Sequence, residues 1–177
     1  MKINLFLSCV IALLLVSCSN SNQVKIDNSD IEFFDFKAFF EKEIKDFSFS
    51  KIKKTVTLND QTETKELTEF DMEKELNLFV KANISRPSWK DKYQVTTSGN
   101  KTTYKAIDDE LTIREIILEK EDTIVQQITI HTLSDNTIFE AAKIMVYQPQ
   151  KGFSIENKQD VMLAGKNNIK IEVAFLK

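Results

Sequence analysis

Apolar residues recur at helical spacing near the start of the chain. At about 100° per residue, one set of five apolar residues falls on a single helical face, which predicts an amphipathic helix over 30–47. Ser29 and Glu32 have the spacing of a capping box, so we expect the helix to begin there. The apolar face consists of Phe33, Phe36, Phe40, Ile44 and Phe47.

A second, narrower apolar stripe lies on the same predicted helix. It contains Ile31, Phe34 and Ala38, and Phe39 lies at the edge between the two stripes. One interpretation is a helix packed between a sheet and another helix. The other is an exposed aromatic surface or a groove wall that binds a partner or an acyl chain. Ile31, Phe34, Ala38 and Phe39 are therefore the candidate interaction or ligand surface.

A second amphipathic helix is predicted over 69–82. Thr68 is a plausible N-cap, and acidic residues occupy the first turns, where the helix dipole favours them. Pro87 prevents much extension beyond the predicted end. The apolar face consists of Met72, Leu76, Phe79 and Val80.

The remaining chain alternates between apolar and polar residues, as strands do. Gly99-Asn100 is a tight hairpin signal, and 120–122 and 134–136 are further predicted turns. We expect an α+β fold with two N-terminal amphipathic helices packed on a curved, largely antiparallel sheet, forming one domain over 29–177. The predicted strands are 51–58, 61–67, 92–98, 101–107, 111–119, 123–132, 137–147, 153–156 and 169–175.

The first residues have the pattern of a signal peptide. Lys2 gives a positive start, and 3–16 form an apolar stretch that is shorter than the roughly 20 residues of a membrane-spanning helix. Residues 19–23 are all polar, which is typical of a flexible tether. We therefore expect a signal peptide over 1–17 and a tether within 18–28.

Leu15-Val16-Ser17-Cys18 resembles the lipobox of bacterial lipoproteins. The resemblance implies that the Cys18 thiol receives a diacylglycerol, that the chain is cut before Cys18, and that the new amino group is acylated. Several acyl chains on one residue give stable membrane attachment, because one chain alone binds only marginally. Asp does not follow Cys18 directly, and by the same resemblance this favours the outer membrane. No acidic run follows Cys18 either, which favours the periplasmic face.

Two further resemblances concern the body of the chain. As a whole it is similar to small lipoproteins of Bacteroidota, which implies no particular activity. Asp122-Thr123-Ile124 resembles the O-glycosylation sequon of the same bacteria, so Thr123 is a candidate modification site.

The composition limits the ligands that the chain is expected to bind. Lys and Arg number 24 against 27 Asp and Glu, giving a net charge of −3, so the basic excess typical of nucleic-acid binding is missing. His131 is the only histidine, and the alternation of apolar and polar residues around it places it on the polar face of a predicted strand. We predict no cofactor and no metal site, although acidic loops at 108–110 and 119–122 leave calcium open. Three glycines cannot supply a nucleotide-binding loop.

The sequence favours two functions. The first is a lipid-anchored, non-enzymatic interaction module of the cell envelope that binds another protein. The alternative is a periplasmic carrier or binder of a hydrophobic, lipid-like ligand. An enzyme that uses carboxylates is the third possibility, because the separation of acidic side chains is spatial and cannot be judged from the sequence.

Overall fold

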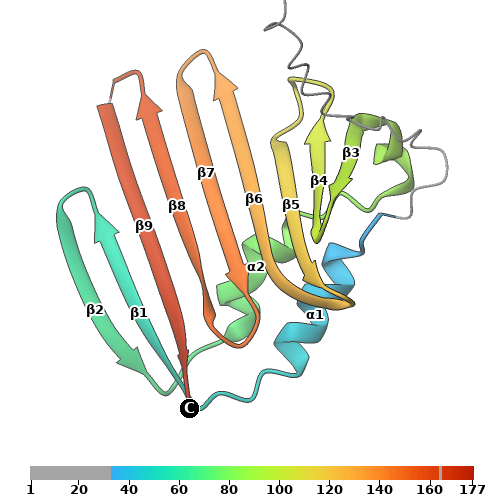
Figure 1. Ribbon diagram of the computed structural model, residues 1–177. Helices are drawn as coiled ribbons and strands as arrows, with labels where there is room; N and C mark the ends of the chain where they lie inside the picture. Colours follow the sequence, from blue (N-terminus) through green and yellow to red (C-terminus); the bar gives the residue numbers. More distant parts are fainter. Residues whose placement is uncertain (1–32, 164) are drawn as a thin grey trace, which may run out of the picture.

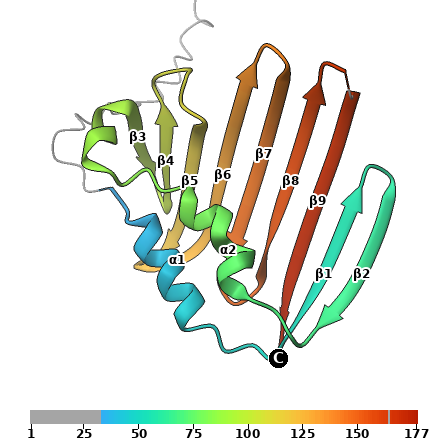
Figure 2. The ribbon, with the colours of Figure 1, turned by 180° about the vertical axis from the view of Figure 1, so that it is seen from behind.

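The computed structural model describes residues 33–163 and 165–177, which form a nine-stranded antiparallel sheet with two α-helices on one face (Figures 1 and 2). The strand order is β2-β1-β9-β8-β7-β6-β5-β4-β3. Strands β3 to β9 follow one another as neighbours, and the β1–β2 hairpin is added beside β9. The strands are β1 (Lys51–Leu58), β2 (Gln61–Leu67), β3 (Tyr93–Ser98), β4 (Lys101–Ala106), β5 (Ile113–Glu121), β6 (Ile124–Asn136), β7 (Phe139–Gln148), β8 (Gly152–Val161) and β9 (Gly165–Leu176).

The expectation of an α+β fold with two N-terminal amphipathic helices is wrong, because the described chain is largely β. The helices α1 (Phe36–Lys45) and α2 (Met72–Lys81) have only 10 residues each, and α2 follows the first hairpin. The antiparallel sheet itself is confirmed by the pairing of every neighbouring strand. The predicted signal peptide, the tether and the capping box at Ser29 lie outside the described residues.

Both helices are shorter than predicted because aspartates inside the predicted segments cap them. The Asp35 carboxylate accepts a hydrogen bond from the Ala38 backbone N–H at 2.9 Å, so α1 begins at Phe36. The Asp71 carboxylate accepts one from the Lys74 N–H in the same way, at 3.2 Å. Each cap satisfies a backbone N–H that has no partner within its helix.

The strands are longer than predicted at the C-terminal end of the chain. β8 and β9 pair from Gly152–Ala174 to Val161–Gly165, well beyond the predicted segments 153–156 and 169–175. The predicted turn at 134–136 is wrong, because these residues pair with 139–141 in the β6–β7 hairpin. Polar residues in long exposed hairpins resemble turn residues in the sequence, which explains both differences.

The core lies between the two helices and the sheet and is rich in aromatic rings. Phe40 of α1 packs on Phe79 of α2 and on Tyr147 of β7, with both pairs of ring centroids 5.2 Å apart. Phe79 also packs on Phe153 of β8, at 5.7 Å. All four side chains are buried. Aromatic contacts from four elements therefore fix the helices on the sheet.

Candidate functional site

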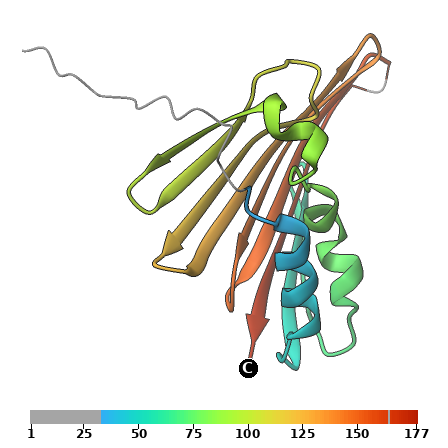
Figure 3. The same ribbon diagram turned by 90° about the vertical axis from the view of Figure 1, so that its right-hand side faces the viewer.

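The sheet has two different faces. We call the side that carries α1 and α2 the helix face and the opposite side the open face; Figure 3 shows both helices on one side. Successive side chains of a strand point to opposite faces. In β8, for example, Phe153 and Ile155 are buried on the helix face, whereas Ser154 between them lies on the open face.

Three of the four predicted surface residues lie together at the start of α1. The rings of Phe34 and Phe39 are 5.6 Å apart and half-buried, and Ala38 is exposed. We call Phe34, Ala38 and Phe39 the aromatic patch. Ile31 lies outside the described residues. The patch borders the core, because Phe34 also packs on Phe36 at 5.0 Å and Phe39 packs on Tyr147 at 6.1 Å.

Three residues that are distant in the sequence hold Phe34. The Ser85 hydroxyl donates a hydrogen bond to the Phe34 carbonyl oxygen at 2.6 Å, and the Tyr104 hydroxyl accepts one from the Phe34 N–H at 3.4 Å. The Lys120 ammonium lies 4.5 Å from the centre of the Phe34 ring, within range of a cation–π interaction. Phe34 precedes α1, yet its position is set by side chains far away in the sequence.

Tyr147 connects the same region to a carboxylate. Its hydroxyl donates a hydrogen bond of 2.6 Å to Glu43 of α1. Burial raises the pKa of the Tyr147 phenol far above its usual value, and the hydrogen bond to Glu43 raises it further. The phenol is therefore held neutral, as a structural link between α1 and the sheet.

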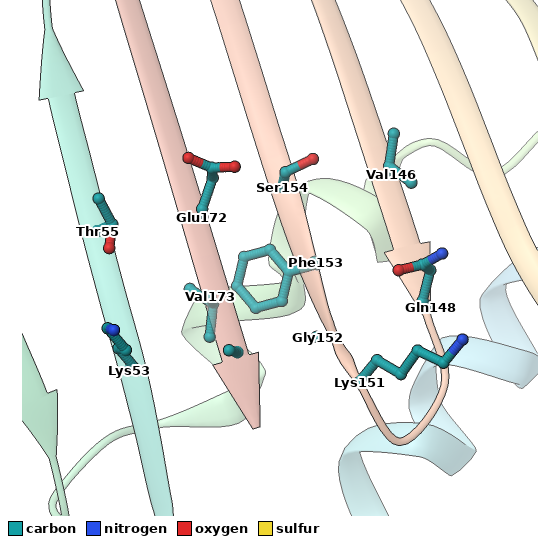
Figure 4. Close-up of a pocket in the computed structure, with 11 residues that line it drawn as sticks. Lys53, Thr55, Val146, Gln148, Lys151, Gly152, Phe153, Ser154, Glu172 and Val173 are labelled. Atoms are coloured by element: carbon teal, nitrogen blue, oxygen red, sulfur yellow. The ribbon is translucent and has the colours of Figure 1, made fainter. Parts of the chain in front are cut away.

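A shallow hollow of about 460 Å³ lies on the open face, across β1, β9, β8 and β7 (Figure 4). Gly152 and Ala174 pair directly across β8 and β9, and both line the hollow. Lys53, Thr55 and Glu172 surround it, and Glu172 forms an ion pair with Lys170 at 2.8 Å. These polar side chains lie at the surface, so the hollow offers ordinary exposed groups and no buried polar anchor.

A second hollow, of about 480 Å³, lies at the other end of the same strands. Asn59, Glu140, Lys158 and Asp160 line it, together with residues of β9. Neither hollow lies beneath α1. Neither hollow has a signal in the sequence, because Gly152 is the first residue of β8 and directly precedes the predicted strand 153–156.

The other predicted residues lie apart from the aromatic patch. His131 is on the open face of β6, opposite Glu115 of β5, with 4.0 Å between its Nδ1 and the carboxylate. Thr123 is exposed in the turn between β5 and β6, after Asp122 with its positive φ of 52°. Sequence reasoning missed Ser85, Tyr104 and Lys120 as partners of Phe34, because only the fold brings them together.

Within the described ranges, no group of three or more His, Cys, Asp or Glu side chains is placed to hold a metal ion. Over the same ranges, no helix is both long enough and apolar enough to cross a membrane. The chain matches no protein-family model, no curated protein and no solved structure.

Proposed function

We propose that this chain is a lipid-anchored, non-enzymatic interaction module of the cell envelope, and that it binds a partner protein through the aromatic patch. One observation carries the proposal: Phe34 and Phe39 are adjacent and half-exposed, and Phe34 is held in place by Ser85 and Lys120. Large aromatic side chains in fixed positions contribute much of the binding energy at protein interfaces, because little conformational entropy is lost when they bind.

The residues around the patch suggest the chemistry of the partner. Lys120 places a positive charge over the Phe34 ring. A partner segment with an apolar side chain beside an Asp or Glu would cover the rings and also meet the ammonium group. The proposed partner is therefore an apolar segment with an acidic neighbour.

The anchor in this proposal is Cys18, acylated as the lipobox resemblance implies. The acyl chains would hold the protein on the outer membrane, facing the periplasm. The segment from Cys18 to Phe33 spans at most about 50 Å when fully extended, so the domain would stay close to the bilayer. This short distance favours a partner that is itself in or near the membrane.

Site-specific crosslinking in the native envelope tests the proposal. A photoreactive amino acid at Ala38 should give one adduct of defined mass, whereas the same group at Thr64, exposed on β2 of the open face, should not. Phe34→Asp should abolish the adduct while the circular dichroism spectrum is retained. The proposal fails if both positions give the same adducts or if Phe34→Asp leaves the Ala38 adduct intact.

One feature favours the second candidate function, a binder of a hydrophobic ligand. The contacts of α1 with α2 and the sheet are largely between rings, including Phe40–Phe79 and Phe39–Tyr147. Such an interface contains few directional bonds, so an acyl chain could replace some ring contacts if α1 shifts.

Native mass spectrometry separates the two candidates. We would analyse residues 22–177, purified without detergent, which keeps every described residue. A reproducible additional mass of lipid size, lost on Phe40→Asp but not on Thr64→Asp, would support the ligand binder. A bare monomer mass would contradict it and leave the interaction module.

A further inference from the structure

Three large apolar side chains are exposed at the end of the sheet farthest from the C-terminus (Figure 1). Ile138 lies in the turn between β6 and β7, and Met162 and Leu163 lie in the turn between β8 and β9. Their exposed fractions are 64%, 67% and 97%. We call these three residues the hairpin tips. Turns usually contain polar residues, so apolar side chains at this exposure call for an explanation.

The two turns form one structural unit. The Met162 N–H donates a hydrogen bond to the Ile138 carbonyl oxygen at 3.2 Å, and Figure 3 also shows the two turns side by side. Beside them, Phe139 pairs with Val161, both half-buried. The exposed apolar side chains therefore share one site at the end of the sheet.

We propose that the hairpin tips insert into the surface of the lipid bilayer to which the chain is anchored. The tips protrude, and a bilayer accepts protruding apolar side chains without a shaped pocket, whereas a protein partner would need one. Apolar side chains at an interface lie about 5–10 Å deep, at the boundary between headgroups and acyl chains. The proposed contact rests on the lipid anchor of the proposed function.

Charged residues lie just behind the tips, at the depth where headgroups would be. Asp135, Glu140 and Asp160 are neighbours across β6, β7 and β8, and Lys166 lies 3.8 Å from Asp160. Lys166 pairs with Asp160 one residue behind Val161 and Gly165, the last pair of β8 and β9 before the turn. Three acids and one lysine do not favour an anionic membrane, so the expected surface is zwitterionic and the contact insensitive to salt.

A fluorescent probe on the full lipidated protein tests this contact. In the lipidated form, as the proposed function has it, Cys18 carries acyl chains and Cys9 is removed with the signal peptide, so Leu163→Cys supplies the only free thiol. The probe is an environment-sensitive dye, and the vesicles contain phosphatidylcholine and phosphatidylethanolamine with brominated acyl chains as quenchers. Lys151→Cys, in the β7–β8 turn at the other end of the sheet, is the matched control.

We expect the dye at position 163 to lose about half of its emission and the dye at position 151 to lose less than about a tenth, because only an interfacial position reaches the bromines. With the dye at Ile138→Cys, the double change Met162→Ser and Leu163→Ser should reduce quenching at least about threefold, since two apolar anchors are removed. Both serines replace exposed side chains, so the fold should be retained.

The remaining outcomes overturn the proposal in distinguishable ways. Equal quenching at 163 and 151, in protein that sediments with the vesicles, would refute the bilayer contact and leave the anchor intact. A blue-shifted emission without bromine quenching would assign the tips to a protein contact. Protein that stays in the supernatant would refute the anchor and the contact together.

Discussion

The two faces of the sheet achieve stability in different ways. On the helix face, rings from α1, α2 and four strands pack at centroid distances of 5.2–6.4 Å, and the largest side chains are fully buried. On the open face, β1 and β2 are joined by threonine pairs, with hydroxyl oxygens 3.0 Å apart at Thr55–Thr64 and at Thr57–Thr62. Hydrophobic burial dominates the first face, and weak cross-strand pairs dominate the second.

This difference separates the residues that hold the fold from those that are free to bind. Truncating a buried side chain on the helix face should lower stability, whereas truncating an exposed side chain on the open face should leave it nearly unchanged. The aromatic patch is at the border, where half-buried rings contribute to both. The predictions below test this separation, from the largest expected effect to the smallest.

Truncating the central ring of the helix face should have the largest effect. Phe79 is fully buried and contacts rings on α1, β7 and β8. Phe79→Ala should lower the free energy of unfolding by about 3–5 kcal/mol, because it loses apolar burial and leaves a cavity. Urea titration followed by circular dichroism measures the loss.

The matched control is Ile144→Ala on the open face of β7, where Ile144 is 41% exposed. It should cost less than about 1 kcal/mol, because much of the side chain is already in water. Equal losses at the two positions would show that the faces do not differ as proposed.

A glycine provides the second test. A Cβ at Gly152 would lie 1.9 Å from the Val173 carbonyl oxygen, and φ is +143° there. Gly152→Ala should cost about 2–3 kcal/mol, because β8 or β9 must shift. Gly99→Ala, in the β3–β4 turn with φ +59° and open space around it, should cost only about 1 kcal/mol of backbone strain. A smaller loss at Gly152 than at Gly99 would contradict the close approach of the strands.

Local patterns in the sequence predicted local structure well. The segments 51–58 and 61–67 were predicted as strands with the bounds that β1 and β2 have, because regular alternation and a polar turn define a hairpin. Helix bounds were less accurate, since several residues near each helix start are able to cap it. The predicted fold class was wrong because both helices are shorter, and the C-terminal strands longer, than the sequence pattern indicated.

Part of the candidate site could also be predicted. The second apolar stripe indicated Phe34, Ala38 and Phe39 from helical spacing, although Phe34 precedes the helix. The partners of Phe34 are Ser85, Tyr104 and Lys120, which are 51, 70 and 86 positions away in the sequence. Contacts over such separations depend on strand order, and a single sequence contains no direct signal for that order.

Alkaline pH should weaken the helix face selectively. Burial raises the pKa of Tyr93 to about 12, whereas an unfolded tyrosine ionises near pH 10. The folded state then holds a proton that the unfolded state releases, so this stabilisation is complete below pH 10 and is lost as the pH rises from 10 to 12.

The expected decrease is about 1.4 kcal/mol per pH unit for each such tyrosine. Urea titrations at pH 8, 10 and 11 measure it, and Tyr93→Phe should reduce the slope by one proton. Tyr93→Phe also removes the hydrogen bond to the Ile113 carbonyl oxygen, so it should cost about 1 kcal/mol at pH 8. An unchanged slope in Tyr93→Phe would show that Tyr93 is not the group that titrates.

The smallest expected effect compares two ion pairs. Lys54 and Glu75 join β1 to α2 at 2.6 Å with side chains only 26% and 19% exposed, whereas Lys65 and Glu63 form an exposed pair on β2 at 2.7 Å. Double-mutant cycles with Lys→Met and Glu→Gln should give a coupling energy of about 1 kcal/mol for the first pair and less than about 0.5 kcal/mol for the second, because water screens exposed charges. The first coupling should persist in 1 M salt, where the Debye length is about 3 Å, and the second should disappear. Equal couplings that vanish together in salt would mean that α2 does not shield the Lys54–Glu75 pair from water.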